Sequence, residues 1–205
     1  MNKDTLKAVV LVCSLNKSPA ESSSELMAKQ VLAELDQYNV EGSIIRAIDH
    51  DIKPGVELDM GDGDDWPKIR SQIMDSDILV LATPIWVGHP CSVAQRVIER
   101  LDAELSETDD QGRLMTYGKV AAVAVVGNED GAHKVCADMF QALNDVGFTI
   151  PAASGIYWVG EAMNKTDYKD LKESPDMVVK SNKSLCSNVA HLARLLKNNP
   201  YPPAS

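Results

Sequence analysis

Residues 14–24 form a loop rich in hydroxyl groups, because five of its eleven residues are serines. The loop follows a short apolar run and precedes a segment whose apolar residues have helical spacing. Hydroxyl groups and backbone N–H groups at the start of a helix bind phosphate directly, and the helix dipole favours the negative charge. The loop therefore suits the phosphomonoester of a ligand, although a capped and solvated serine loop would have the same composition.

Residues 83–90 place Trp86 in a stiff turn between Pro84 and Pro90, with Gly88 close behind it. The prolines restrict the backbone, and Gly88 allows the chain to approach a neighbouring group closely. An indole held in this way can pack against a flat aromatic ring. An ordinary core or subunit-interface tryptophan would need no ligand, and the residues leave both interpretations open.

Residues 127–131 form a third polar loop, GNEDG, without β-branched side chains. Its amide groups can bind the polar edge of a heterocycle, whereas a plain turn with Asp130 as helix cap explains it equally well. The first loop has neither the G-x-G-x-x-G nor the G-x-x-x-x-G-K-[ST] pattern, so a dinucleotide pyrophosphate and an ATP triphosphate lose their usual cradles. A mononucleotide remains as the kind of phosphate-bearing ligand that this loop could bind.

Candidate acids, bases and nucleophiles are few. His89 and His133 flank the second and third loops, but a lone histidine in a loop is more often a polar surface residue. A thiol at a helix start, as expected for Cys91, can have a lowered pKa, although a small buried residue is the simpler interpretation. The cysteines form no C-x-x-C pair, which argues against zinc and iron-sulfur sites and for buried thiols in a reducing compartment. They are Cys13, Cys91, Cys136 and Cys186.

The elements that must position these loops follow from apolar patterning. The runs at 8–13, 78–82 and 120–126 are continuous rather than alternating, which predicts strands covered on both faces. We expect further strands at 43–48 and 148–153. Helical patterns alternate with the strands, so the fold class is α/β: one domain over residues 1–205 with a doubly wound, five-stranded parallel sheet of order 2-1-3-4-5.

The expected helices include a short one at 66–74 and a long final one. For the final helix we expect Ser174 as N-cap and Pro175 in the first helical position. A phospho-receiver domain shares the five-stranded layout, but it needs an acceptor Asp where this chain has Leu81-Ala82-Thr83. The segment 49–65 holds seven acids and resembles a calcium loop, yet it lacks Glu in the twelfth position, so a solvated acidic loop is expected and no metal site.

The charge balance limits the partners. Thirty acidic against twenty basic residues give a formal net charge of −10 at pH 7, which disfavours nucleic acid and anionic membranes. The apolar run near the N-terminus is too short for a signal peptide, and no stretch approaches the roughly 18 apolar residues of a membrane helix. We therefore expect a cytoplasmic protein.

The three loops together resemble a known family. The serine-rich loop, TPIWVG at 83–88 followed by VIERLD at 97–102, and GNEDG at 127–131 are similar to the flavodoxin-like NADPH-dependent FMN reductases. The resemblance covers nearly the whole chain. It implies FMN as cofactor and NAD(P)H as co-substrate, with the phosphate in the first loop and the isoalloxazine between the other two. The implied contacts are Ser14, Asn16, Ser22, Ser23, Ser24, Thr83, Pro84, Ile85, Trp86, Val87, Gly88, Gly127, Asn128, Glu129, Asp130 and Gly131.

Two departures from the family pattern matter. The common pattern has a shorter phosphate loop with an arginine after the first serine, whereas this chain has Asn16-Lys17 and several more residues before the helix. Which serines contact the phosphate therefore stays open. The compact cysteine cluster of the iron-sulfur branch is absent from the sequence.

The sequence thus predicts an FMN-dependent oxidoreductase that takes hydride from NAD(P)H and reduces a small acceptor such as a quinone, a flavin or a similar electrophile. No side chain need act as catalytic acid, base or nucleophile, because the flavin carries the redox chemistry. A flavodoxin-type electron carrier and a flavin-free binding protein of the same fold are the alternatives. The segment 155–170, with Tyr157 and Trp158, favours an enclosed active site, and a homodimer or homotetramer is expected.

Overall fold

The computed structural model describes residues 5–162 and 164–203. Its centre is a parallel sheet in the order β2-β1-β3-β5-β6. The strands are β1 (Leu6–Val12), β2 (Val40–Arg46), β3 (Ile78–Trp86), β5 (Val120–Gly127) and β6 (Gly155–Val159). A two-residue strand, β4 (His89–Pro90), pairs antiparallel with the end of β3. Counted along the main strands, the order is the expected 2-1-3-4-5, so the doubly wound α/β prediction is confirmed.

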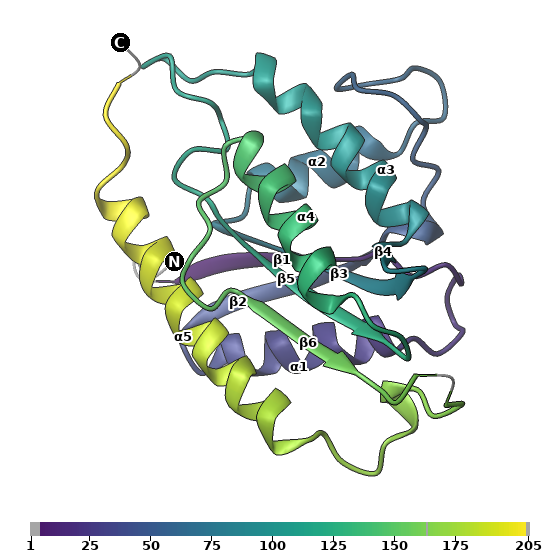
Figure 1. Ribbon diagram of the computed structural model, residues 1–205. Helices are drawn as coiled ribbons and strands as arrows, with labels where there is room; N and C mark the ends of the chain where they lie inside the picture. The colour runs from purple at the N-terminus through teal and green to yellow at the C-terminus, as the bar shows by residue number, and fades with distance from the viewer. Residues whose placement is uncertain (1–4, 163, 204–205) are drawn as a thin grey trace.

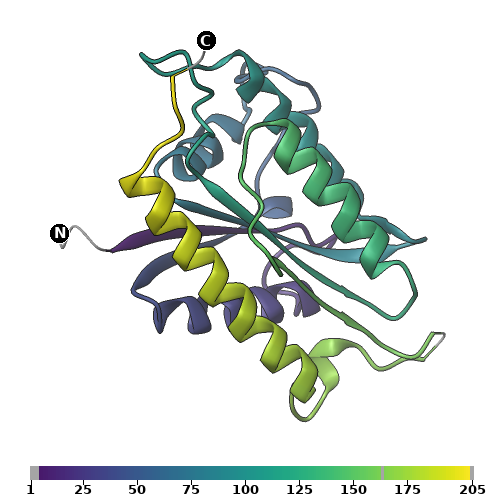
Figure 2. The same cartoon turned by 60° about the vertical axis from the view of Figure 1, so that its left-hand side comes forward.

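Helices cover both faces of the sheet, and Figures 1 and 2 show the three layers. One core packs beneath α1 (Ser23–Asp36) and α5 (Asp176–Asn198). The other packs beneath α2 (Trp66–Met74), α3 (Ser92–Leu101) and α4 (Ala132–Asp145). Because both faces are covered, the central strands need apolar residues at every position, which explains their continuous apolar runs. None of the described helices is long and apolar enough to cross a membrane.

The fifth main strand lies later in the chain than expected, at Gly155–Val159 instead of 148–153. Residues 148–153 form its approach: Thr149 makes only an isolated bridge to Val120, and Ala153 has a φ of 54°. Pro151 has no N–H to donate to a ladder. The second strand also begins earlier, at Val40, and ends at Arg46, where a 3₁₀ turn, η1 (Ala47–Asp49), begins.

The start of α5 differs from the expectation as well. Pro175 is the N-cap and makes no side-chain cap, so the prediction that Ser174 caps the helix is wrong. The Ser174 hydroxyl is held elsewhere, by Gln30 Nε2 at 2.9 Å and the Tyr168 hydroxyl at 2.9 Å. A tertiary network thus replaces the local cap.

The acidic segment 49–65 is mostly exposed, and Asp64 anchors it to the protein. The Asp64 carboxylate accepts a hydrogen bond from Arg100 Nη1 at 2.7 Å, and both side chains are fully buried. Burial by itself raises the pKa of Asp64, but hydrogen bonds from the Met60 N–H and Arg100 outweigh it and lower the pKa. The pair therefore fixes the acidic segment against α3.

Candidate functional site

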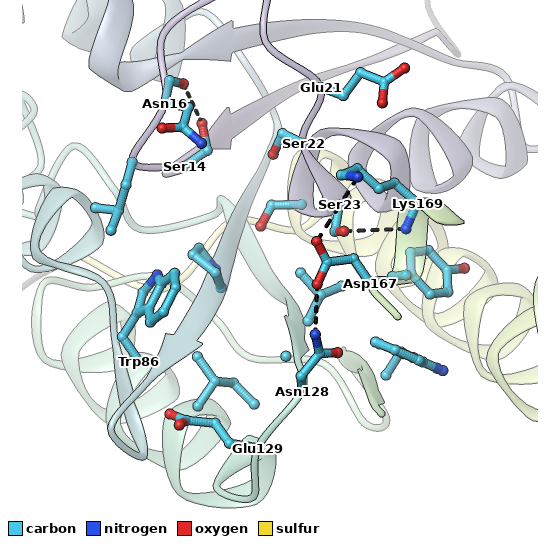
Figure 3. A pocket seen from close by; sticks show the side chains of 18 of the residues that line it. Ser14, Asn16, Glu21, Ser22, Ser23, Trp86, Asn128, Glu129, Asp167 and Lys169 are labelled. Carbon is cyan, nitrogen blue, oxygen red and sulfur yellow. Dashed lines mark hydrogen bonds and ion pairs between the residues drawn. The ribbon is translucent and has the colours of Figure 1, made fainter. Parts of the chain in front are cut away.

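A cavity of about 410 Å³ lies beyond the carboxyl ends of β1, β3 and β5, where the strand order reverses. All three loops singled out in the sequence border it (Figure 3). Its volume is in the range of small-molecule sites, about 300–1,000 Å³. Eleven of the expected contacts line it: Ser14, Asn16, Ser22, Ser23, Ser24, Pro84, Ile85, Trp86, Gly127, Asn128 and Glu129.

The other five expected contacts do not line the cavity. Thr83 is fully buried, and its hydroxyl accepts a hydrogen bond from the Cys91 N–H. Val87 and Gly88 form the turn between β3 and β4, and Asp130 is exposed. Gly131 has a φ of 122°, and a Cβ there would lie 3.0 Å from the Gly88 Cα. This glycine lets the second and third loops meet.

The upper end of the cavity in Figure 3 is built by the serine loop and the start of α1. Ser22 is the N-cap of α1, and its hydroxyl accepts a hydrogen bond from the Glu25 N–H at 3.3 Å. Ser23 and Ser24 are the first helical residues, so their N–H groups belong to the unpaired first turn. The Ser23 hydroxyl also accepts a hydrogen bond from the backbone N–H of Lys169. This end can bind an anion.

Arg46 is a cavity-lining residue that was not singled out in the sequence. It ends β2 and lines the cavity, yet the residue is only 6% exposed. Its Nε donates to the Ser14 hydroxyl at 3.0 Å, and its Nη1 donates to the Ala20 carbonyl and to Glu25 Oε2. Its Nη2 is buried without a partner. A basic residue at the carboxyl end of a predicted strand was the signal in the sequence that could have identified it. The sequence prediction drew the site from the loops after the first, third and fourth strands, and Arg46 ends the second.

Trp86 forms a wall near the lower end of the cavity in Figure 3 and is 54% exposed. The next two residues, Val87 and Gly88, make the hairpin turn with φ values of 54° and 71°. Gly88 adopts such values readily, whereas a β-branched valine does so only under strain. The Gly88 N–H donates to Glu129 Oε1 at 2.9 Å, which ties the hairpin to the third loop. The indole is therefore presented on a braced turn.

Asn128 lies across the lower end of the cavity from Trp86 (Figure 3). Its Nδ2 donates to Asp167 Oδ1 at 2.6 Å, which fixes the orientation of the amide. Its Oδ1 is buried without a partner and is therefore a free hydrogen-bond acceptor. This position suits the N–H group of a polar ring edge.

The end of β6 and the segment after it supply one wall of the cavity, of which only Trp158 was singled out in the sequence. Its lining residues are Trp158, Ala162, Asn164, Asp167, Tyr168 and Lys169. Trp158 packs against Tyr168 with ring centroids 5.5 Å apart. The signal in the sequence was the aromatic segment 155–170, but Tyr157 lies apart from the cavity lining and bonds His133 through its hydroxyl at 2.8 Å.

The other candidate groups lie outside the cavity. His89 Nδ1 is 3.2 Å from Lys134 Nζ, and neither His89 nor His133 lines the cavity. Cys91 is the N-cap of α3 and is buried, with its thiol against the Cys13 carbonyl. All four cysteines are buried and free. Burial raises the pKa of the Cys136 thiol to about 11 and that of Cys186 to about 12, so both stay protonated at neutral pH.

These features fit an FMN-like ligand. At one end of the cavity, Arg46 Nη2 and the start of α1 require an acceptor, and a phosphate provides one. At the ring end, Asn128 Oδ1 requires a donor such as a ring N–H. Trp86 offers an aromatic face at this same ring end.

The sequence pattern that defines the NADPH-dependent FMN reductases matches residues 6–164, most of the chain. The chain belongs to this family. The resemblance seen in the sequence is thus confirmed, and the protein is a flavoprotein oxidoreductase by family, with FMN and NAD(P)H as the family's cofactors.

A relative in Streptomyces davaonensis is 8-demethyl-8-aminoriboflavin-5'-phosphate synthase. It is 31% identical over 208 residues, which cover 96% of this chain and 80% of the relative. The crystal structure of RosB with the bound intermediate 8-demethyl-8-formylriboflavin-5'-phosphate has a TM-score of 0.88 and 31% identity, and the match covers 96% of this chain and 82% of that one.

Two further comparisons differ in how much of the other protein they cover. A flavodoxin from the domain Archaea has a TM-score of 0.59 and 11% identity, covering 92% of this chain and 99% of that one, so it shares the fold. A Mycobacterium bovis protein described as the divalent metal cation transporter MntH is 32% identical over 95% of this chain. The chain spans only 29% of that protein's length.

Proposed function

We propose that this FMN reductase family member holds FMN in the cavity, takes hydride from NAD(P)H and reduces a small acceptor such as a quinone, a flavin or a similar electrophile. One observation carries the proposal. Two residues that line the cavity, Arg46 and Asn128, each keep one buried polar atom without a protein partner: the donor Nη2 of Arg46 and the acceptor Oδ1 of Asn128. FMN carries a phosphate for the first and a ring N–H for the second.

The role of the chain's own residues is then to bind and orient the flavin. The α1 start and Arg46 hold the phosphate, while Asn128, fixed by Asp167, holds the ring edge. When bound, FMN supplies the hydride chemistry, so the protein contributes position and electrostatics. Trp86 is half-exposed beside the ring end, which leaves this side accessible to a second flat ring from solvent. Alignment of two rings is the catalytic contribution that such a site makes.

The test is anaerobic mixing of the FMN-loaded protein with NADPH and, separately, NADH. The expected result is loss of the visible flavin absorbance at a rate that saturates with nucleotide, followed by recovery when a quinone is added. A flavodoxin-type electron carrier would keep its absorbance with both nucleotides and would be reduced only by a protein partner or dithionite.

A second candidate follows from the relative that makes an 8-amino flavin phosphate and from RosB with its 8-formyl flavin phosphate. In that case the flavin phosphate in this cavity is the substrate rather than the cofactor. Mass spectrometry of the flavin recovered after aerobic turnover separates the two. FMN of unchanged mass supports the cofactor role, and a flavin changed at its 8-methyl group supports the second candidate.

We also propose that a second copy of the chain covers the rim of the cavity. Exposed apolar residues gather near it: Leu15 at 44%, Trp86 at 54% and Val87 at 85%. Light scattering after size-exclusion chromatography should give a dimer or tetramer, and a monomer would contradict this assembly. Location in the cytoplasm stays a prediction from the cysteine pattern.

A further inference from the structure

We propose that Arg46 makes this cavity select the phosphorylated flavin over riboflavin, and that Glu25 sets how strongly it does so. The inference rests on the proposed function, because it concerns the phosphate end of the same cavity. The serine loop has Asn16-Lys17 where the family pattern carries an arginine. Lys17 does not line the cavity, so a guanidinium from the end of β2 supplies the positive charge there.

The geometry of Arg46 leaves one side of its guanidinium for a ligand. Nε and Nη1 bind the Ser14 hydroxyl, the Ala20 carbonyl and Glu25, and thereby hold the loop. Nη2 is buried without a partner in a side chain that is only 5% exposed. A planar guanidinium fixed at two nitrogens presents the third in a defined direction, which suits a phosphate oxygen.

Glu25 limits the strength of this interaction. Its Oε2 lies 3.1 Å from Arg46 Nη1, and its side chain is 23% exposed. The residue also stands in the first turn of α1, next to the N–H groups that would bind the phosphate. Its negative charge partly neutralises Arg46 and repels a phosphate dianion. Removing that charge should therefore tighten phosphate binding.

Lys169 is the competing cation, and its ammonium group is already paired. Its Nζ lies 2.8 Å from Asp170 and 4.0 Å from Asp167. The hydrogen bond to Asp170 raises the pKa of Lys169. Its contribution to the first loop is the backbone N–H bond to Ser23. Arg46 thus differs from Lys169 in that its unpaired donor is buried, away from water.

The experiment measures dissociation constants of FMN and riboflavin for the wild-type protein, Arg46→Gln, Glu25→Gln and Lys169→Gln. Glu34→Gln is the matched control, because it removes one negative charge from the same helix without contacting Arg46. Circular dichroism and thermal unfolding of each variant report the fold.

In Arg46→Gln, FMN affinity should fall about 10- to 100-fold, the usual worth of a charge-assisted bond, while riboflavin affinity stays unchanged. In Glu25→Gln, FMN should bind several-fold more tightly than in the wild type, again with riboflavin unchanged. Glu34→Gln and Lys169→Gln should keep the wild-type ratio of the two affinities.

Three results with the variants would overturn the inference. An equal loss of affinity for FMN and for riboflavin in Arg46→Gln would show that the arginine only holds the loop in place. Weaker FMN binding in Glu25→Gln would show that the ion pair is purely structural, and this variant decides the question if Arg46→Gln does not fold. Equal affinities for FMN and riboflavin in Lys169→Gln would show that Lys169, and not Arg46, binds the phosphate. A wild-type protein that binds both ligands equally refutes this inference alone, whereas one that binds neither refutes the proposed function as well.

Discussion

At the scale of single residues, the account rests on polar atoms that the folded chain leaves unpaired. A buried polar atom without a hydrogen bond costs about 1–3 kcal/mol, so its presence in a cavity indicates a missing ligand atom. Arg46 Nη2 and Asn128 Oδ1 both lie in residues that line the same cavity. Unpaired atoms also occur in Trp66, Arg100 and Ser154, but these residues do not line it.

Asn128→Ala should weaken FMN and riboflavin equally, by about 5- to 30-fold, because one ring hydrogen bond of 1–2 kcal/mol is lost. The ratio of the two affinities should stay that of the wild type, in contrast to Arg46→Gln. Isothermal titration calorimetry gives both constants. A loss of affinity for FMN with unchanged affinity for riboflavin would show that Asn128 contacts the phosphate instead of the ring.

Trp86→Ala should loosen FMN while the fold stays intact, because the side chain is 54% exposed. The matched control is Trp66→Phe, since Trp66 is fully buried beneath Arg100 and outside the cavity lining. Adding FMN should quench tryptophan emission strongly, and Trp86→Phe should remove part of that quenching. Full quenching in Trp86→Phe would mean that Trp158, the other tryptophan of the lining, alone senses the ligand.

The residue that sequence reasoning could not assign was Arg46. Its role depends on the parallel pairing of β1 with β2, which sets Val12 beside Arg46 and so brings the second strand's end to the serine loop. The serines and Trp86 could be singled out because the relevant signal is local: residue type and position after an apolar run. Asp167 has no such local signal, since its partner Asn128 is 39 residues away.

At the scale of elements, the hairpin of β3 and β4 carries Trp86 on a strained turn. Val87 has a φ of 54° in this turn, a conformation that asparagine tolerates and β-branched residues avoid. Val87→Asn should therefore raise stability by about 1 kcal/mol. Thermal unfolding measures the shift, with Val56→Asn as control, because Val56 is also exposed and lies outside the positive-φ set. Equal shifts in both variants would show that strain at Val87 is not the cause.

Element positions were predictable where burial alone decides them. The central strands β1, β3 and β5 are apolar over most of their length because helices cover both faces, and their apolar runs located all three. The fifth main strand was misplaced because residues 148–153 are also apolar but approach the sheet without a full ladder. The cap assigned to Ser174 failed because its hydroxyl bonds Tyr168 and Gln30 instead, and Gln30 lies far away in the sequence.

At the scale of the whole molecule, the buried pair of Asp64 and Arg100 should make the fold sensitive to acid. The folded-state pKa of Asp64 lies below its ordinary value of 3.8, so the unfolded chain binds this proton more readily. The pair's contribution is complete above that value and is lost as the pH falls through the folded-state pKa.

Asp64→Asn should lower stability at neutral pH by about 3 kcal/mol, because it leaves a buried guanidinium without its counter-charge. The variant should also lose less stability than the wild type between neutral and acidic pH. Urea unfolding at several pH values measures both effects. An acid dependence as steep as that of the wild type would show that other carboxylates are responsible.

The central claim is that FMN pairs the two buried polar atoms of the cavity, and a crystal structure of the FMN complex tests it most directly. The account predicts a phosphate oxygen within hydrogen-bond distance of Arg46 Nη2 and a ring N–H on Asn128 Oδ1, with the isoalloxazine beside Trp86. A flavin bound outside this cavity, or one bound inside it with Arg46 Nη2 and Asn128 Oδ1 still unpaired, would contradict the account.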